Sequence, residues 1–392
     1  MEIPLKKLAS EYPIVTLTGP RQSGKTTLAK LAFPNYEYIS LEDPDNRDFA
    51  KNDPRGFLAK YSSRVIFDEI QRSPDLLSYL QTMVDEAPLS GRFILTGSQQ
   101  FLLNQKVSQS LAGRTALLCL LPFSLAELNA RLPQEFWQTN NVSKVLPAPK
   151  SLFETIYAGF YPRIHDRSLN PQQWYRDYFE TYITRDVKNI LQLGDSRAFE
   201  QFLRLLAGRS GQLLNLTSLG NDSGVSHTTA KRWLSVLEAS YIIKLLQPHF
   251  NNFNKRIIKS PKIYFLDSGL LCYLLRISAA DILATHPQFG SIFETFVIGE
   301  ILKGFLHQGR EAPLYFWRDR TGNEIDLILD RGERLFPVEI KASQTITPGL
   351  YQNIQTWLAL PGNKQSSGGL VYGGDDFQTR SNIQVIPWYA IS

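Results

Sequence analysis

Residues 14–29 of this 392-residue chain read IVTLTGPRQSGKTTLA, an apolar run followed by a glycine-rich loop and a helical pattern. The loop fits the P-loop signature G-x-x-x-x-G-K-[ST] from residue 19 to residue 26. The signature depends on this context, because loop N–H groups and the positive end of the following helix together bind phosphate oxygens. The alternative is a chance match on a glycine turn, and the flanking strand and helix argue against it.

The signature predicts a nucleotide site with ATP and Mg²⁺ as ligands. We expect Lys25 to reach the β- and γ-phosphates and the Thr26 hydroxyl to ligate Mg²⁺. Glycines allow the backbone to approach the phosphates closely. The residues expected to form the nucleotide site are Gly19, Pro20, Arg21, Gln22, Ser23, Gly24, Lys25, Thr26 and Thr27.

A second apolar run, residues 64–71 (RVIFDEIQ), ends in the two acids Asp68 and Glu69. Parallel strands present their ligands at their carboxyl ends, so both acids should arrive beside the P-loop. Asp68 is then the candidate to hold Mg²⁺ through water, and Glu69 the candidate general base for the attacking water. Two solvated acids at a strand end are the alternative. The alternation of strands and helices up to residue 121 predicts a doubly wound α/β sheet.

Taken together, these motifs give the chain a family resemblance. It resembles the prokaryotic AAA-type ATPases in which a P-loop domain precedes a C-terminal domain long described as of unknown function. The matching segments are residues 19–26, 65–69, 95–98, 110–114, 122–128, 182–186, 255–265 and 339–341. Because AAA+ sites usually complete at subunit interfaces, the resemblance implies a homo-oligomer.

The resemblance also implies roles for two later residues of the first domain. AAA+ ATPases carry a polar sensor after a further strand, and residues 92–99 (RFILTGSQ) offer Ser98 first, with Thr96 and Gln99 behind it. Arg114 follows a glycine and is a candidate arginine finger or second sensor. An ordinary surface arginine and a plain strand-to-loop turn remain the alternatives.

The segment 215–234 predicts a helix-turn-helix, and strands near residues 243–246 and 263–265 would make it a winged helix. Between residues 226 and 263, seven Lys or Arg residues accompany a single acid, which favours contact with phosphates. Recognition helices read DNA through their N-terminal residues. The candidate DNA-binding residues are His227, Thr228, Thr229, Lys231, Arg232, Lys255 and Arg256. A winged helix that serves only as a packing module is the alternative.

The C-terminal part reads as helix, three strands, helix and strand, an order that resembles the restriction-endonuclease-like fold. The residues that fill its acidic and E-x-K signature are Glu294, Asp326, Glu339 and Lys341. Glu339 and Lys341 are two residues apart and share one face of a strand. Asp326 and Glu339 would hold a second Mg²⁺ or Mn²⁺, and Lys341 would stabilise the phosphate or help to activate water. An inactive relic in which Lys341 neutralises the acids is the alternative.

Composition restricts the remaining classes. The net charge of +5 is mild, and the two cysteines, Cys119 and Cys272, lie in apolar runs as buried thiols would in a reducing compartment. No signal-peptide pattern opens the chain, and no apolar run approaches the length of about 18 residues that a membrane span needs. We therefore expect a cytoplasmic protein with no membrane partner.

These observations predict three parts: a P-loop AAA-type ATPase domain over residues 1–130, a linker with helical lid and winged helix over 131–265, and a restriction-endonuclease-like domain over 266–392. The predicted function is Mg²⁺-dependent ATP hydrolysis coupled to engagement of DNA. Two other functions stay open: an ATP-gated, metal-dependent DNA nuclease, and a nucleotide-switched scaffold for a protein partner.

Overall fold

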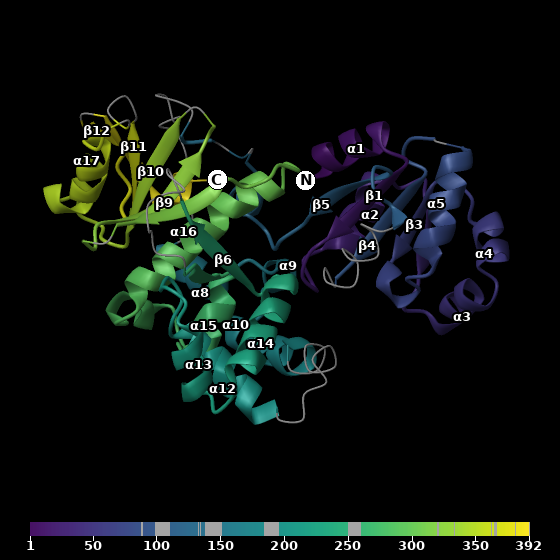
Figure 1. Cartoon of the computed structure of the whole chain (residues 1–392), viewed down its shortest axis with the longest axis horizontal. Coiled ribbons are helices and arrows are strands. Elements are labelled where there is room, and N and C mark those ends of the chain that lie inside the picture. The colour runs from purple at the N-terminus through teal and green to yellow at the C-terminus, as the bar shows by residue number, and fades with distance from the viewer. Residues whose placement is uncertain are drawn as a thin grey trace. The chain divides into compact units, whose positions relative to one another are not determined.

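The computed structural model describes residues 1–87, 89–98, 110–131, 133, 135–137, 151–183, 196–249, 260–319, 321–332, 334–361, 363, 367–380 and 382–391. The chain divides into two compact units (Figure 1). The N-terminal unit comprises residues 1–122, 239–241 and 305–311, and the C-terminal unit comprises residues 123–238, 242–304 and 312–392. Three residues singled out in the sequence, Gln99, Lys255 and Arg256, lie outside the described residues.

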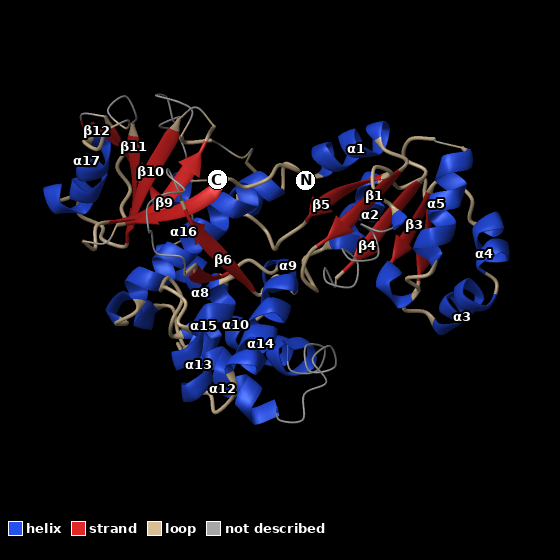
Figure 2. Cartoon of the chain, viewed as in Figure 1, coloured by secondary structure: helices blue, strands red, loops and turns tan. Residues whose placement is uncertain are grey.

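The N-terminal unit contains a five-stranded parallel sheet with the order β2-β3-β4-β1-β5 (Figure 2). Its strands are β1 (Ile14–Thr18), β2 (Glu37–Ser40), β3 (Val65–Asp68), β4 (Phe93–Gly97) and β5 (Thr115–Cys119). Because all five strands are parallel, the residues that follow β1, β3 and β4 emerge at one edge of the sheet. This is the edge at which the P-loop and the two acids were expected.

Helices cover both faces of this sheet, as a doubly wound fold requires. They are α1 (Glu2–Glu11), α2 (Lys25–Ala32), α3 (Pro44–Asn52), α4 (Pro54–Lys60), the 3₁₀ turn η1 (Ile70–Arg72) and α5 (Leu76–Glu86). Alternate strand residues face opposite sides. Val15 packs in a core with residues of α1 and α2, whereas Ile14 packs with residues of α3, α4 and α5. The expected α/β class is confirmed.

The C-terminal unit contains most of the helices. They are α7 (Leu125–Leu128), α8 (Leu152–Ala158), α9 (Pro162–Asp166), α10 (Pro171–Tyr178), the π-helical turn η2 (Phe179–Ile183), α12 (Ser196–Ala207), α13 (Leu216–Asp222), α14 (His227–Ala239), α15 (Ser268–Leu274), η3 (Asp281–Thr285), α16 (Phe289–Leu306), η4 (Pro348–Tyr351), α17 (Gln352–Leu358) and η5 (Trp388–Ala390). The aromatic side chains of α10 are packed: Trp174 stacks on Tyr178 with ring centroids 4.9 Å apart, and Tyr175 is fully buried. These aromatic side chains are therefore part of the packed interior of the unit.

An eight-stranded mixed sheet forms the other layer of the C-terminal unit, in the order β12-β13-β11-β10-β9-β8-β6-β7. Its strands are β6 (Ile243–Pro248), β7 (Lys262–Phe265), β8 (Leu314–Arg318), β9 (Glu324–Asp330), β10 (Leu335–Lys341), β11 (Gly368–Tyr372), β12 (Gln378–Arg380) and β13 (Ile383–Pro387). The expected helix and strand order is present, with β12 and β13 as additions.

The two strands expected as a wing have a second role. β6 and β7 pair antiparallel, but β6 also pairs with β8 through Gln247 and Pro248. A boundary between residues 265 and 266 therefore cuts through one sheet, and the division into three parts stays a prediction.

Both cysteines are free, and no helix in the described part of the chain is long and apolar enough to cross a membrane.

Candidate nucleotide site and a second charged cluster

The P-loop lies directly after β1 and is held by close backbone packing. A Cβ on Gly19 would lie 2.0 Å from the carbonyl oxygen of Leu120, and the Gly19 φ of +142° also disfavours a side chain. Gln22 and Gly24 have φ values of 64° and 95°, and α2 begins immediately afterwards at Lys25. The strand, tight loop and helix that the signature requires are therefore all present.

Lys25 is buried and donates to two carbonyl oxygens of the loop, those of Gly19 at 3.0 Å and Pro20 at 2.7 Å. Burial lowers the pKa of Lys25 to about 8, although Glu69 and Asp68 act in the opposite direction. The Ser23 hydroxyl is buried in the same loop without a hydrogen-bond partner. A buried ammonium and an unsatisfied hydroxyl fit a loop that binds phosphate oxygens.

The side chains of Thr26 and Asp68, the two residues predicted to hold Mg²⁺, lie together. The Thr26 hydroxyl donates to both Asp68 carboxylate oxygens, at 2.9 and 3.1 Å. Asp68 also accepts from Tyr38 at 2.7 Å and from Thr96, which fixes the carboxylate from two further strands. Sequence reasoning missed Tyr38, because its contact comes from β2, the neighbour of β3, and no motif marks it.

Glu69 and Ser98 also lie together. The Ser98 hydroxyl donates to the Glu69 carboxylate at 3.1 Å, and Gln71 donates to the same oxygen. Glu69 adopts a left-handed backbone conformation with φ 56°, and its N–H donates to the Thr96 hydroxyl at 3.3 Å. The candidate base and the candidate sensor therefore share one hydrogen-bonded group. Gln71, next to the acid pair in sequence, was not singled out.

Arg114 lies at the amino-terminal ends of the parallel strands, opposite the ends at which the P-loop lies. Its carbonyl oxygen accepts from the N–H of Ile14, the first residue of β1, whereas the P-loop follows the last residue of β1. Its guanidinium binds both carboxylate oxygens of Asp85, at 2.6 and 2.8 Å. β5 runs parallel to β1 and carries Arg114 at its amino end, away from the P-loop of its own chain, and the role of Arg114 as an arginine finger or second sensor stays a prediction.

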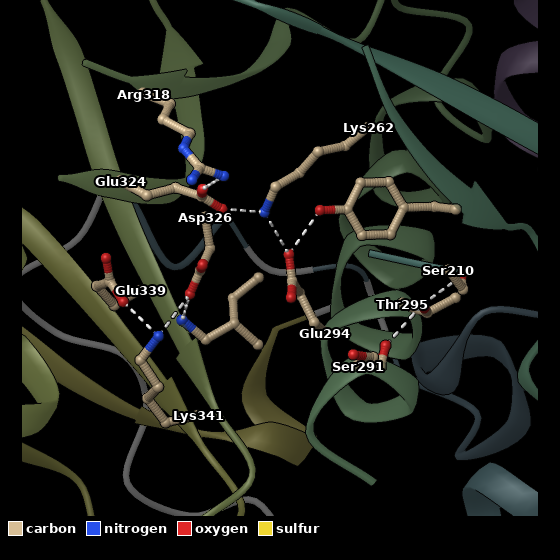
Figure 3. Close-up of polar contacts among 12 residues, drawn as sticks. Ser210, Lys262, Ser291, Glu294, Thr295, Arg318, Glu324, Asp326, Glu339 and Lys341 are labelled. Atoms are coloured by element: carbon tan, nitrogen blue, oxygen red, sulfur yellow. Dashed lines mark hydrogen bonds and ion pairs between the residues drawn. The ribbon is translucent and has the colours of Figure 1, made fainter. Parts of the chain in front are cut away.

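The four residues of the C-terminal signature lie in one cluster, to which other elements also contribute (Figure 3). Asp326 on β9 accepts from Lys341 at 3.0 Å and from the N–H of Ile340 at 2.9 Å, both on β10. Lys341 also pairs with Glu339, with Nζ and Oε2 2.5 Å apart. Asp326 and Glu339 are both buried.

Glu294, on α16, has partners that were not predicted. Tyr264 donates to its carboxylate at 2.5 Å, and the ammonium of Lys262 lies 3.2 Å from the same oxygen. Lys262 also pairs with Glu324 on β9, and Glu324 in turn meets Arg318 at 3.1 Å. We call Glu294, Glu324, Asp326 and Glu339 the carboxylate cluster.

Burial and crowding shift the pKa values of the carboxylate cluster. Burial, together with the charge of Asp326, raises the pKa of Glu339 to about 8 and that of Glu294 to about 7. Burial also acts to raise the pKa of Asp326, but Lys341 and Lys262 outweigh it and hold this pKa below its ordinary value. The cluster therefore binds protons in the folded state at a pH where an unfolded chain would not.

The conformational stability of the C-terminal unit is expected to fall as the pH rises from about 5 to about 8. Glu294 and Glu339 have folded pKa values above the unfolded value of about 4.3, so in this window the folded state binds more protons, and the free energy of unfolding decreases with pH. The lowered pKa of Asp326 acts in the opposite sense only at lower pH. Thermal unfolding of the full chain measures the effect. The melting temperature should shift by about 2–4 °C for each kcal/mol of change in the free energy of unfolding.

Glu339→Gln removes one of the two raised groups and should flatten this pH dependence. Glu154→Gln, at an exposed position on α8, is the matched control and should retain the wild-type slope. Equal slopes in the wild type and Glu339→Gln would show that Glu339 does not carry a raised pKa.

The candidate DNA-reading face of α14 is exposed. Its inner face, Ala230, Trp233, Leu234 and Leu237, is buried, and Trp233 packs edge-on against two phenylalanines of α12. His227, Thr228, Lys231 and Arg232 are exposed and Thr229 is half-buried.

Two of the described basic residues of the expected patch lie next to acids. Lys262 is buried in the carboxylate cluster, and Lys244 lies 4.0 Å from Glu238. Of the seven basic residues counted between 226 and 263, the two that are described, exposed and without a described ion-pair partner are Lys231 and Arg232. Among the described residues, these two are therefore the candidates for phosphate contact by this face.

The parallel sheet, the P-loop and the two acids after β3 define the N-terminal unit as an AAA-type P-loop domain. Residues 11–129 match the family model described as an AAA domain. Residues 149–281 and 289–391 match two further models, each described as a domain of unknown function.

The chain is 30% identical over 386 residues to uncharacterized proteins of Mycobacterium tuberculosis and Mycobacterium bovis, covering 98% of this chain and 82% of each relative. The chain therefore belongs to the same family as these two mycobacterial proteins.

Two solved structures are less similar to this chain than the mycobacterial proteins are. A Walker-type ATPase of Pyrococcus abyssi has a TM-score of 0.41 and 16% identity, over 70% of this chain and 94% of that one. AMPPCP-bound DnaA from Aquifex aeolicus has a TM-score of 0.25 and 16% identity, over 60% of this chain and 85% of that one. Because both scores are below 0.5, the class of the N-terminal unit rests on the family match and on its own site.

Proposed function

We propose that this protein hydrolyses ATP with Mg²⁺ and that turnover is coupled to engagement of DNA by the α13–α14 helix-turn-helix and the C-terminal sheet. The proposal of ATPase activity rests on one observation. Lys25, Thr26, Asp68 and Glu69 lie together at the carboxyl ends of the parallel strands. The pair Thr26–Asp68 is already hydrogen-bonded, and Glu69 is held by Ser98 and Gln71.

Each residue then has a distinct role in phosphoryl transfer. Lys25 leaves the carbonyl oxygens of Gly19 and Pro20 to neutralise phosphate charge. Thr26 and Asp68 would hold Mg²⁺, which would neutralise charge on the phosphate oxygens. Glu69 accepts the proton of the attacking water, with Ser98 orienting its carboxylate. Arg114, placed away from the nucleotide of its own chain, would act as a finger only on the nucleotide of a neighbouring subunit in a homo-oligomer.

DNA engagement is supported by the exposed, unpaired charges on α14. A winged helix formed by α13, α14, β6 and β7 would present the N-terminal turns of α14 to DNA, with Lys231 and Arg232 contacting phosphates. The domain that contains β8 to β11 would add a restriction-endonuclease-like surface. Whether ATP or ADP is bound would control how tightly the winged helix and this surface together bind DNA.

ATP turnover is expected to rise on addition of duplex DNA at low salt and to lose this stimulation at high salt. The double variant Lys231→Ala/Arg232→Ala should weaken DNA binding and reduce the slope of log K against log salt by about 2, because each phosphate contact contributes about 0.9. The measurement is phosphate release, together with fluorescence anisotropy of labelled DNA at several salt concentrations.

Arg167→Ala/Arg176→Ala removes the same charge from the same unit and serves as the control, because both arginines already pair with neighbouring aspartates. This variant should keep the wild-type salt slope. The DNA proposal is wrong if DNA leaves turnover unchanged, or if the two double variants behave alike.

The same assay separates the two other functions that the sequence leaves open. An ATP-gated nuclease would cut the DNA with Mg²⁺ or Mn²⁺ and lose this activity in Asp326→Ala. A nucleotide-switched scaffold for a protein partner would bind ATP with little turnover, and Glu69→Gln would leave its cellular phenotype unchanged. Lys262, which the signature does not account for and which pairs with Glu294 and Glu324, weighs against the nuclease function.

A further inference from the structure

The carboxylate cluster is closed by ammonium groups on both sides (Figure 3). Lys262 lies between Glu294 and Glu324, and Lys341 lies between Asp326 and Glu339. With Arg318 on Glu324, three cationic side chains meet four carboxylates. In formal charge this leaves −1, where a bare group of four carboxylates would carry −4.

Each carboxylate of the cluster already has a donor or a cationic partner. Glu294 accepts from Tyr264 and pairs with Lys262 through the same oxygen. Asp326 receives both Lys341 and the N–H of Ile340 on one oxygen. Glu339 pairs with Lys341, although its two buried carboxylate oxygens form no hydrogen bond within the chain. A divalent ion prefers several oxygen ligands, and between Asp326 and Glu339 it would have to displace the Lys341 ammonium. Among the described residues, no group of three or more His, Cys, Asp or Glu side chains is arranged to hold a metal ion.

Lys262 is the partner that is hardest to displace. Its side chain is 4% exposed, and it comes from β7 at the edge of the same sheet. Its ammonium lies 5.7 Å from the centroid of the Phe316 ring on β8. Burial acts to lower its pKa, but Glu294, Asp326 and Glu324 outweigh burial and raise it, so Lys262 stays charged near neutral pH. Removing its charge would leave Glu294 and Glu324 without their shared partner.

Lys341 differs from Lys262 in its access to solvent. Its side chain is 33% exposed, so it can move without leaving a buried site. It is also the lysine that the restriction-endonuclease-like signature accounts for. The feature that departs from the signature is therefore Lys262 together with its second partner, Glu324.

We propose that Lys262 is a built-in cation that takes the place of the second metal ion, so that the carboxylate cluster binds neither Mg²⁺ nor Mn²⁺. A lysine ammonium neutralises the carboxylates but does not act as a Lewis acid on water as a metal does. The C-terminal unit therefore does not carry out metal-dependent cleavage at this cluster. The acids and lysines instead hold β7, β9, β10 and α16 together. This inference is independent of the proposed ATPase.

The proposal is tested by measuring how much Mn²⁺ the nucleotide-free full chain binds. The electron paramagnetic resonance signal of free Mn²⁺ reports this binding. The wild type and Asp326→Asn should bind Mn²⁺ equally, because any ion near the P-loop is common to both. Lys262→Met retains the apolar stem and removes the charge. Lys262→Met should gain one Mn²⁺ site that the wild type lacks, so that its apparent Kd for Mn²⁺ is lower than that of the wild type by about tenfold or more. The double variant Lys262→Met/Asp326→Asn should lose this site.

Two control variants separate charge from disturbance of the site. Lys262→Arg keeps a cation between Glu294 and Glu324 and should gain no Mn²⁺ site. Tyr264→Phe removes a donor from Glu294 but leaves Lys262, and should also gain none. Circular dichroism melting establishes that each variant is folded.

Two results overturn the proposal. One is an Mn²⁺ site in the wild type that is absent from Asp326→Asn, which would show that the cluster takes a metal with Lys262 in place. The other is a folded Lys262→Met protein that gains no site. If Lys262→Met fails to fold, the comparison of the wild type with Asp326→Asn still decides, because equal binding supports the proposal and unequal binding refutes it.

Discussion

Replacing Lys25 with alanine is expected to lower the rate of ATP turnover by about 100-fold or more. Its ammonium is buried in the P-loop, and the two carbonyl oxygens that it contacts belong to the same loop. Charge that develops on the transferred phosphoryl group is stabilised by such preplaced donors, and loss of one donor costs about 10²–10³ in rate. Phosphate release at saturating ATP measures the effect, and binding of a fluorescent nucleotide separates lost affinity from lost turnover.

The fold is expected to survive this change, because burial already disfavours the charged form of Lys25 and lowers its pKa to about 8. Lys51→Ala, at an exposed position on α3, is the matched control and should turn over ATP at the wild-type rate. Wild-type turnover in Lys25→Ala would exclude the P-loop as the catalytic site. A melting temperature far below that of Lys51→Ala would instead identify Lys25 as a structural residue.

The nucleotide site could be predicted because its chemistry is local in sequence. Gly19 to Thr26 form one loop, and Asp68 and Glu69 end one strand, so short motifs place all of them once the strands are parallel. Tyr38 could not be predicted in this way. It reaches Asp68 because β2 lies beside β3, and strand order is a property of the whole sheet.

The same limit explains why the sequence did not show where Arg114 lies, and why Lys262 was omitted. Arg114 precedes a strand, so a parallel sheet carries it to the edge opposite the P-loop, a conclusion that the register of β1 and β5 makes explicit. Lys262 counted in the sequence as part of a basic surface. It is buried because β7 joins the C-terminal sheet through β6 and faces acids from α16 and β9, which are distant in sequence.

A second large effect is expected from a buried ion pair on α16 that no motif marks. The side chains of Glu300 and Lys303 are 0% and 2% exposed and meet at 2.7 Å. Glu300 accepts from the N–H of Leu125 at 2.6 Å, and Lys303 donates to the carbonyl oxygen of Phe123 at 3.0 Å. The pair thus fastens the segment that starts α7 to the long helix α16 within the C-terminal unit.

Lys303→Met is expected to lower the free energy of unfolding of the C-terminal unit by about 3–5 kcal/mol, because it leaves Glu300 as a buried charge without its partner. Chemical denaturation followed by tryptophan fluorescence gives the value. The double variant Glu300→Leu/Lys303→Met should recover part of the loss, since replacing both charges of a buried pair with apolar groups is often close to neutral. The N–H of Leu125 and the carbonyl of Phe123 lose their partners in the double variant, which is why recovery should be incomplete. If the double variant is less stable than the sum of Glu300→Leu and Lys303→Met predicts, the two side chains do not stabilise each other, and each acts only through the backbone group that it binds.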